Sequence, residues 1–237
     1  MSDKKITRIQ GENGSSEGSS STWQPTAESA SKAKTNRIIS IVLWVLAFAV
    51  QIGVILKLRE VPVNMAWIIG LIVVQLALVL GANVLWKKAN RLDPASEKDQ
   101  FKFFVQNQLG LIISVLAFLP LVVLILTNKN LSGKQKGILG SVAAAALVLS
   151  GIVGTDFNPA SIEQYTEQTE RVKELNDGRN FVYWTKSGKS YHLYNDCGYI
   201  NSNRTKEIFE GTVAQARELK NITDLCDRCE RQAMKEE

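Results

Sequence analysis

Four long apolar runs constrain the fold of this chain more than any other feature. They cover residues 38–56, 63–86, 103–127 and 137–154, and none of them contains a charged residue. A helix of about 20 residues crosses the roughly 30 Å hydrocarbon core of a bilayer. Inside a bilayer the backbone polar groups must be paired within the segment itself, so such runs predict transmembrane helices. We therefore predict an all-α membrane domain, a four-transmembrane-helix bundle, over residues 37–155.

The fourth run is the shortest and the least hydrophobic of the four. Small residues recur in it at intervals of four, namely Gly137, Ser141 and Ala145, and also Gly140 and Ala144. Small residues at this spacing let helix backbones approach closely, which predicts a helix packed tightly by its neighbours. If this run did not cross, the C-terminal segment would lie outside the cell.

The basic residues beside the runs predict the topology. With the N-terminus inside, the inner flanks carry Lys32, Lys34, Arg37, Lys87, Lys88, Arg91, Lys98 and Lys102. The outer loops carry Lys57, Arg59, Lys129, Lys134 and Lys136. Lys and Arg accumulate on the cytoplasmic side of membrane proteins. We therefore expect a multi-pass protein of the cell membrane with both termini in the cytoplasm.

The two ends of the chain are polar. Residues 10–36 are rich in Ser, Gly and Glu, so we expect residues 1–36 to form a disordered arm.

Residues 156–178 predict a connecting helix, capped by Ser161 and terminated by Gly178. Its thin apolar stripe leaves self-association into a homo-oligomer open. Residues 179–237 then predict a small α+β cytoplasmic module with an aromatic β-hairpin at residues 181–194.

The single histidine and all three cysteines of the chain lie in this module. They fall in two pairs, His192 with Cys197 and Cys226 with Cys229. Two cysteines separated by two residues can turn both sulfurs toward one cation, and a second pair completes a tetrahedral site. Thiolate and imidazole ligands favour zinc, and a module this small gains folding energy from a structural metal. We predict that these four residues bind one zinc ion.

The same residues also allow other interpretations. Cys226 and Cys229 could form a redox pair, which would call for a βαβ context that the sequence lacks. His192 could be an ordinary strand residue and the cysteines small buried side chains. The sequence has no His-Glu-x-x-His motif, P-loop or dinucleotide-binding fingerprint. We therefore expect no enzymatic activity and no catalytic residues.

The segments "VYWTKSGKSYHLYNDCGYI" and "GTVAQARELKNITDLCDRC" resemble a known kind of module. They are similar to a small zinc-binding tail found on some bacterial nucleases and membrane proteins, and more distantly to the metal-binding domain of the Ada alkylation-repair protein. The resemblance implies that His192, Cys197, Cys226 and Cys229 are the ligands. In the Ada-like domain a methyl-accepting cysteine occupies the first ligand position, where this chain has His192. The resemblance therefore implies binding rather than alkyl transfer.

The charge distribution argues against nucleic acid as the partner. Residues 155–237 hold 12 Lys and Arg against 15 Asp and Glu, so the net basic charge of the chain lies around the apolar runs. Four aromatic side chains predict a contact face for an unidentified cytoplasmic protein, although some of them would also suit the core of the module: Tyr183, Trp184, Tyr194 and Tyr199.

The function expected from these features is partner binding or regulation by a membrane protein that presents a cytoplasmic zinc module. One alternative is a channel or transporter gated by the module. The runs contain amides such as Gln75 and Asn83, but they lack the intramembrane charges that coupled transport usually needs. A zinc protein that acts on nucleic acid is the other alternative.

Overall fold

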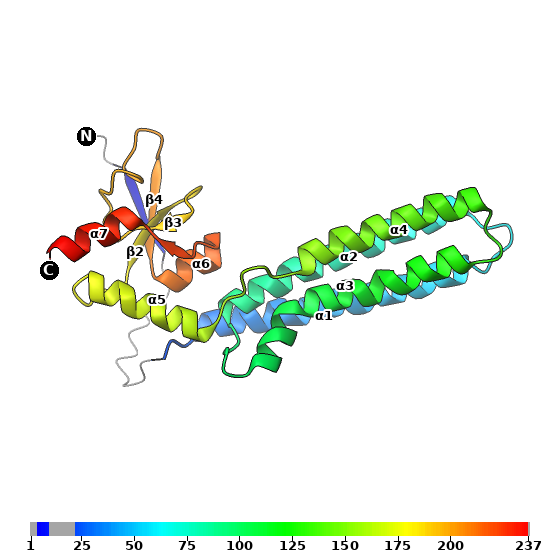
Figure 1. Ribbon diagram of the computed structural model, residues 1–237, viewed down its shortest axis with the longest axis horizontal. Coiled ribbons are helices and arrows are strands. Elements are labelled where there is room, and N and C mark those ends of the chain that lie inside the picture. The colour runs from blue at the N-terminus through cyan, green and yellow to red at the C-terminus, as the bar shows by residue number, and fades with distance from the viewer. Residues whose placement is uncertain (1–3, 10–21, 237) are drawn as a thin grey trace. The chain divides into compact units, whose positions relative to one another are not determined.

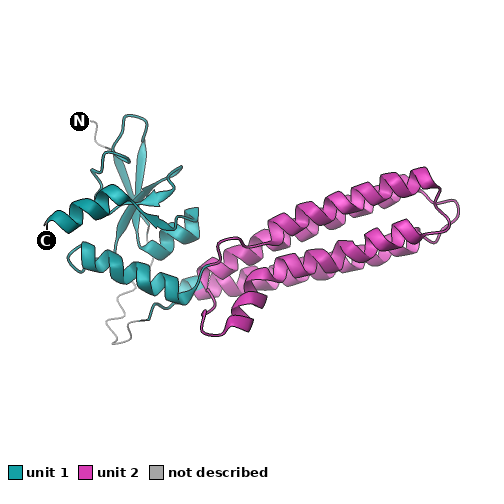
Figure 2. Cartoon of the chain, viewed as in Figure 1, with its two compact units in different colours: residues 1–29, 160–237 teal, residues 30–159 magenta. Residues whose placement is uncertain are grey.

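The computed structural model describes residues 4–9 and 22–236. The chain forms two compact units, which Figure 2 shows in different colours. Unit 1 combines residues 1–29 with residues 160–237, and unit 2 consists of residues 30–159. The chain therefore begins in unit 1, builds unit 2, and returns to complete unit 1.

Unit 2 is a bundle of long helices that run side by side (Figure 1). They are α1 (Ala27–Lys57), α2 (Met65–Leu92), α3 (Gln100–Thr127) and α4 (Gly133–Gly154). All four are long and apolar enough to cross a membrane, which confirms the four predicted apolar helices. Polar caps set where three of them begin, because Asn64, Asp99 and Ser132 each accept a hydrogen bond from the backbone N–H three residues later.

The interior of the bundle is close-packed between α2, α3 and α4. Ile68 and Val79 of α2, Phe118 of α3, and Leu139 and Ala143 of α4 are fully buried in one cluster. Many Ile, Leu and Val side chains of the same helices face outward and are exposed. An apolar exterior of this kind is what a helix bundle presents to lipid tails.

One amide in the interior connects all four helices. Asn83 of α2 accepts a hydrogen bond from Trp44 Nε1 of α1 at 3.1 Å. Its Nδ2 donates to Ser114 Oγ of α3 at 3.0 Å and to the backbone carbonyl of Ser150 in α4 at 3.2 Å. Asn83 is completely buried, so these bonds satisfy a group that has no access to water.

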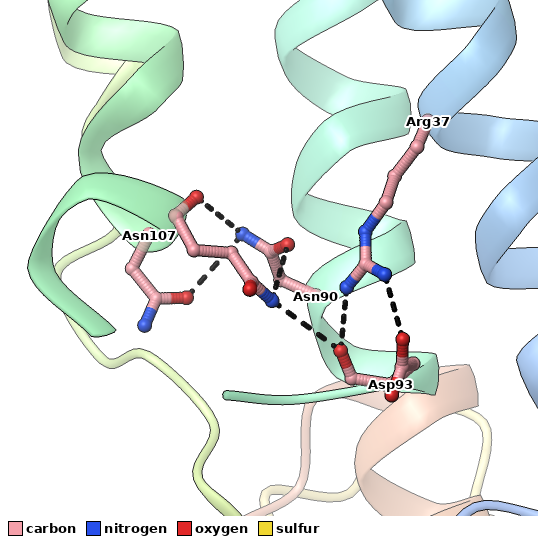
Figure 3. Close-up of polar contacts among 5 residues, drawn as sticks. Arg37, Asn90, Asp93 and Asn107 are labelled. Carbon is pink, nitrogen blue, oxygen red and sulfur yellow. Dashed lines mark hydrogen bonds and ion pairs between the residues drawn. The ribbon is translucent and has the colours of Figure 1, made fainter. Parts of the chain in front are cut away.

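A second polar cluster lies where α1 and α3 enter the bundle and α2 leaves it (Figure 3). Arg37 donates to Asp93 Oδ2 at 2.6 Å and to the Asp93 carbonyl at 2.7 Å. Asn90 Nδ2 donates to the Gln106 carbonyl at 2.9 Å and to Asn107 Oδ1 at 3.3 Å. The cluster therefore fastens α1 to the end of α2 and α2 to the start of α3.

Unit 1 is a small α+β fold. Its strands are β1 (Lys5–Arg8), β2 (Val182–Thr185), β3 (Ser190–Tyr191), β4 (Glu207–Gly211) and β5 (Asp224–Leu225). Its other helices are α5 (Ile162–Leu175), α6 (Val213–Lys220) and α7 (Asp227–Glu236). Among the described residues, one sheet has the order β1-β4-β2, with β1 parallel and β2 antiparallel to β4, and β3 pairs in parallel with β5.

The predicted hairpin over residues 181–194 is present in part. Tyr183 and His192 exchange both backbone hydrogen bonds, at 2.8 and 2.7 Å, so the chain folds back between them. The two strands then diverge, because β2 pairs with β4 and β3 pairs with β5. Ser161 caps α5 as predicted, and Gly178, with a φ of 79°, follows the end of that helix.

The structure differs from the expected disordered arm in both of its described parts. Residues 5–8 form β1 within the sheet of unit 1. Trp23 packs its ring edge-on against Tyr165 of α5, with the ring centroids 4.6 Å apart, and α1 begins at Ala27. Composition predicted disorder because these segments have too few apolar residues to form a core of their own. They are ordered because they pack on residues that lie more than 140 positions later in the chain. The expected disorder of residues 10–21 lies outside the described residues.

Candidate metal centre

Parallel pairing of two short strands brings the first two donors together. Tyr191 at the end of β3 lies in register with Leu225 at the end of β5. The Cys226 N–H donates to the Tyr191 carbonyl at 2.9 Å. His192 and Cys226 follow these two positions directly, so the backbone places them side by side.

The Cys-x-x-Cys spacing places two sulfurs at the start of α7. The Cys226 carbonyl accepts a hydrogen bond from the Glu230 N–H at 3.0 Å, so Cys226 immediately precedes the helix. Cys229 lies in the first turn of α7 and is 1% exposed. Residues three apart at a helix start lie on the same side of it, so both thiols point to one place.

A turn carries the fourth donor. The Cys197 N–H donates to the Tyr194 carbonyl at 3.3 Å, and the Cys197 carbonyl accepts from Ile200 and Asn201 at 2.9 and 2.8 Å. These bonds fold residues 194–201 into consecutive turns that return Cys197 toward the strands. The structure thus brings together all four residues predicted as ligands.

The donor atoms are close enough to share one ion. One ligand atom of each of the four residues lies within 4.8 Å of those of the other three, and all four residues are buried. Cys229 Sγ and His192 Nδ1 are 3.7 Å apart. Metal bonds of about 2.3 Å to sulfur and 2.0 Å to nitrogen in a tetrahedron separate such ligands by about 3.5 Å. This Cys3His group can therefore hold a metal ion, and His192 turns Nδ1 toward it.

Burial shifts the pKa values of two of the donors, His192 and Cys229, in the direction that favours their neutral forms. It lowers the pKa of His192 to about 4, because an imidazolium loses its hydration there. Burial, together with the neighbouring Cys197 and Cys226, raises the pKa of Cys229 to about 12. Near neutral pH His192 is therefore neutral and has one unprotonated ring nitrogen available to a metal, while the Cys229 thiolate needs a bound cation to be stable.

The same environment disfavours the redox alternative. Reactive cysteine pairs have lowered pKa values and partial exposure, because the thiolate is the attacking species. Cys229 has the opposite properties, a raised pKa and almost complete burial. The environment of Cys229 therefore suits a metal ligand better than the attacking thiolate of a disulfide exchange.

The four aromatic residues predicted as a contact face do not form one surface. Trp184 is fully buried and stacks on Phe209 with centroids 6.2 Å apart, so its prediction as a contact residue is wrong. Side chains alternate along β2, and Trp184 takes an inward position. Tyr183 and Tyr194 are half-buried against the core, and Tyr199 is 69% exposed.

Sequence reasoning missed one feature of unit 1, the pairing of β1 with β4. Glu207 and Glu210 of β4 each bind a basic side chain of β1. The available signal was the short basic and apolar alternation of "KKITRI" at residues 4–9, set against the acidic "EIFEG" at 207–211.

The chain was also compared with known proteins. No family model, no curated protein and no solved structure matches it. The donor set and its geometry are therefore the basis for any statement about what this site binds.

Proposed function

We propose that the chain is a multi-pass membrane protein whose zinc-stabilised cytoplasmic module binds a partner protein. The observation that carries the proposal is the buried cluster of three thiols and one imidazole at the centre of the module. Soft sulfur donors with an imidazole favour zinc over magnesium, calcium or manganese.

The donor count supports a structural metal rather than a catalytic one. Zinc enzymes keep one position open for water, usually with three protein ligands, whereas structural sites are closed by four. His192, Cys197, Cys226 and Cys229 supply four donors from inside the core. Zinc, when bound, joins β3, β5, α7 and the turn at Cys197, and its ligands exclude water.

The shared sheet of unit 1 supports the predicted topology. β1 precedes the first apolar helix and β4 follows the fourth, yet the two strands pair along four residues. Segments that share a sheet lie on one side of a membrane, so the chain crosses an even number of times. Four crossings then place the cysteines on the same side as the N-terminus, and the basic flanks favour the cytoplasm.

The interior amides support an architectural role for the bundle. Asn83 and Asn90 direct their Nδ2 groups to carbonyl and side-chain acceptors on neighbouring helices. Such bonds hold membrane helices together. These two amides do not support the transport alternative, because their Nδ2 groups donate hydrogen bonds to other parts of the protein.

The test is site-specific cross-linking in intact cells. A photoreactive residue replaces exposed Tyr199, and a second chain carries Cys226→Ser as well. We expect one cytoplasmic protein to cross-link to the first chain and to be lost with Cys226→Ser. A photoreactive residue at lipid-facing Val84 serves as the matched control. Identical cross-links with and without Cys226 would overturn the proposal.

A further inference from the structure

The edge of β4 that pairs with β1 presents main-chain groups and two acidic side chains to an extended segment. β4 is the central strand of its sheet, and only a short N-terminal strand covers this edge in the described structure. Pairing runs from Lys5 opposite Glu207 to Arg8 opposite Glu210, and the Ile9 N–H donates to the Glu210 carbonyl at 2.8 Å. Main-chain bonds of this kind accept any extended segment, so the side chains determine what is selected.

Two carboxylates give this edge its selectivity. Arg8 Nε donates to Glu210 Oε1 at 2.7 Å. Lys5 Nζ lies 3.4 Å from Glu207 Oε1, and Thr7 Oγ1 donates to the same oxygen at 2.5 Å. Beyond them, Ile9 packs against the core of the module. The module therefore contacts a basic side chain at position 5, a hydroxyl at position 7, a second basic side chain at position 8 and an apolar side chain at position 9.

The two side chains of the Arg8–Glu210 ion pair differ in their exposure. The Glu210 side chain is 12% exposed, whereas the Arg8 side chain is 77% exposed. With β1 in place the Glu210 carboxylate has little contact with water, and the cation that stabilises it is Arg8 of the exposed edge strand. The acidic groups thus lie on the central strand of the sheet, and the basic groups lie on the exposed strand at its edge.

The docked strand has the properties of an exchangeable ligand. It is four residues long with mostly exposed side chains, and its Lys5–Glu207 pair is a surface ion pair, a kind that contributes little to stability. We propose that the β4 edge, defined by Glu207 and Glu210, binds an extended basic segment of a partner protein, and that residues 5–9 occupy it in its absence. This inference rests on the proposed partner-binding function and names the chemistry of the partner.

The test uses the full chain in lipid nanodiscs and a fluorescent synthetic peptide of residues 4–9 as the probe. One variant lacks residues 1–9, and a second keeps them but carries Lys5→Glu and Arg8→Glu. A tethered strand competes at an effective concentration near millimolar. Freeing the edge should therefore tighten peptide binding by about tenfold or more relative to the unaltered chain.

Charge reversal provides the matched control. Glu210→Lys in either variant should abolish the binding, and a peptide with glutamate in place of Arg8 should regain it. Two results would overturn the inference. One is an equal peptide affinity for the unaltered chain and both variants, and the other is a peptide affinity that Glu210→Lys does not change. Zinc content and the Tyr199 cross-link, measured in parallel, report on the proposed function separately. A peptide that binds while the cross-link is absent would support the β4 edge as a binding surface and would reject only the proposed function.

Discussion

At the scale of single residues, the backbone rather than long side chains sets the position of the donors. His192 and Cys226 are adjacent because β3 and β5 pair in register, and Cys229 follows one helical turn later. Tyr191, which precedes the first donor, is itself buried, and this raises its pKa to about 12. The spacing of the histidine and cysteines predicted which residues meet, because ligand pairs have few workable separations. It could not predict the parallel pairing that joins the two pairs, since β3 and β5 have only two residues each.

Removing one donor should unfold the module. A structural zinc contributes about 10 kcal/mol or more, which matches or exceeds the net stability of a small domain. We expect His192→Ala and Cys226→Ser each to lose the metal and to expose residues 179–237 to proteolysis of the purified full chain. Tyr199→Ala, at an exposed position two residues after Cys197, is the control and should leave the metal content and the protease resistance unchanged. Protease resistance equal to that of the parent in both donor variants would refute a structural metal.

Acid should release the metal within a defined range of pH. Burial lowers the pKa of His192 to about 4 from an ordinary value near 6.5. A lowered folded pKa means that the unfolded chain binds more protons between these values, so stability is present above about pH 6.5 and declines as the pH falls toward 4. We expect metal retained at about pH 6.5 and released by about pH 4, as measured with a chromogenic chelator. Complete release at about pH 6.5 would contradict this account.

At the scale of elements, backbone contact between glycines brings α3 and α4 together. A Cβ on Gly154 would lie 2.5 Å from the Gly110 carbonyl carbon, and one on Gly110 would lie 2.9 Å from the Gly154 oxygen. The sequence predicted close packing of α4 from its small residues. It could not assign the contact, because the rotation of a helix depends on its neighbours: Gly137, one of the predicted contacts, faces open space, while Gly140 lies against Leu126.

Two glycine substitutions in α4 should therefore have opposite effects. Gly154→Ala forces α3 and α4 apart and should destabilise the bundle by about 1–3 kcal/mol. Gly137→Ala meets no atom within 4 Å and should stabilise the helix by up to about 1 kcal/mol, because alanine restricts the unfolded chain. Reversible unfolding in mixed micelles measures both. Equal effects of the two substitutions would contradict the packing described here.

At the scale of the whole molecule, segments that precede the apolar helix bundle in the sequence pack with segments that follow it. Hydropathy was sufficient to predict the four helices, because the length and apolar composition of each run can be seen in the run itself. The contribution of β1 and Trp23 to unit 1 was beyond sequence reasoning, because each is stabilised by groups from the far end of the chain. In the proposed membrane topology, this return of the chain requires an even number of crossings.

Cysteine labelling in intact cells tests the topology that follows. Lys98 and Lys129 are exposed in the loops after α2 and α3. A membrane-impermeant maleimide should label the Lys129→Cys variant before lysis and the Lys98→Cys variant only afterwards. The native cysteines are buried and serve as the background control. Labelling of both variants in intact cells, or of Lys98→Cys alone, would reject cytoplasmic termini.

X-ray absorption spectroscopy at the zinc edge tests the central claim most directly. The purified full chain should contain one zinc per molecule, with three sulfur neighbours at about 2.3 Å and one nitrogen at about 2.0 Å. The Cys226→Ser variant, purified in parallel, should lack this first shell. A shell of oxygen and nitrogen without sulfur, or a chain that carries no zinc after growth and purification in zinc-replete medium, would contradict the account.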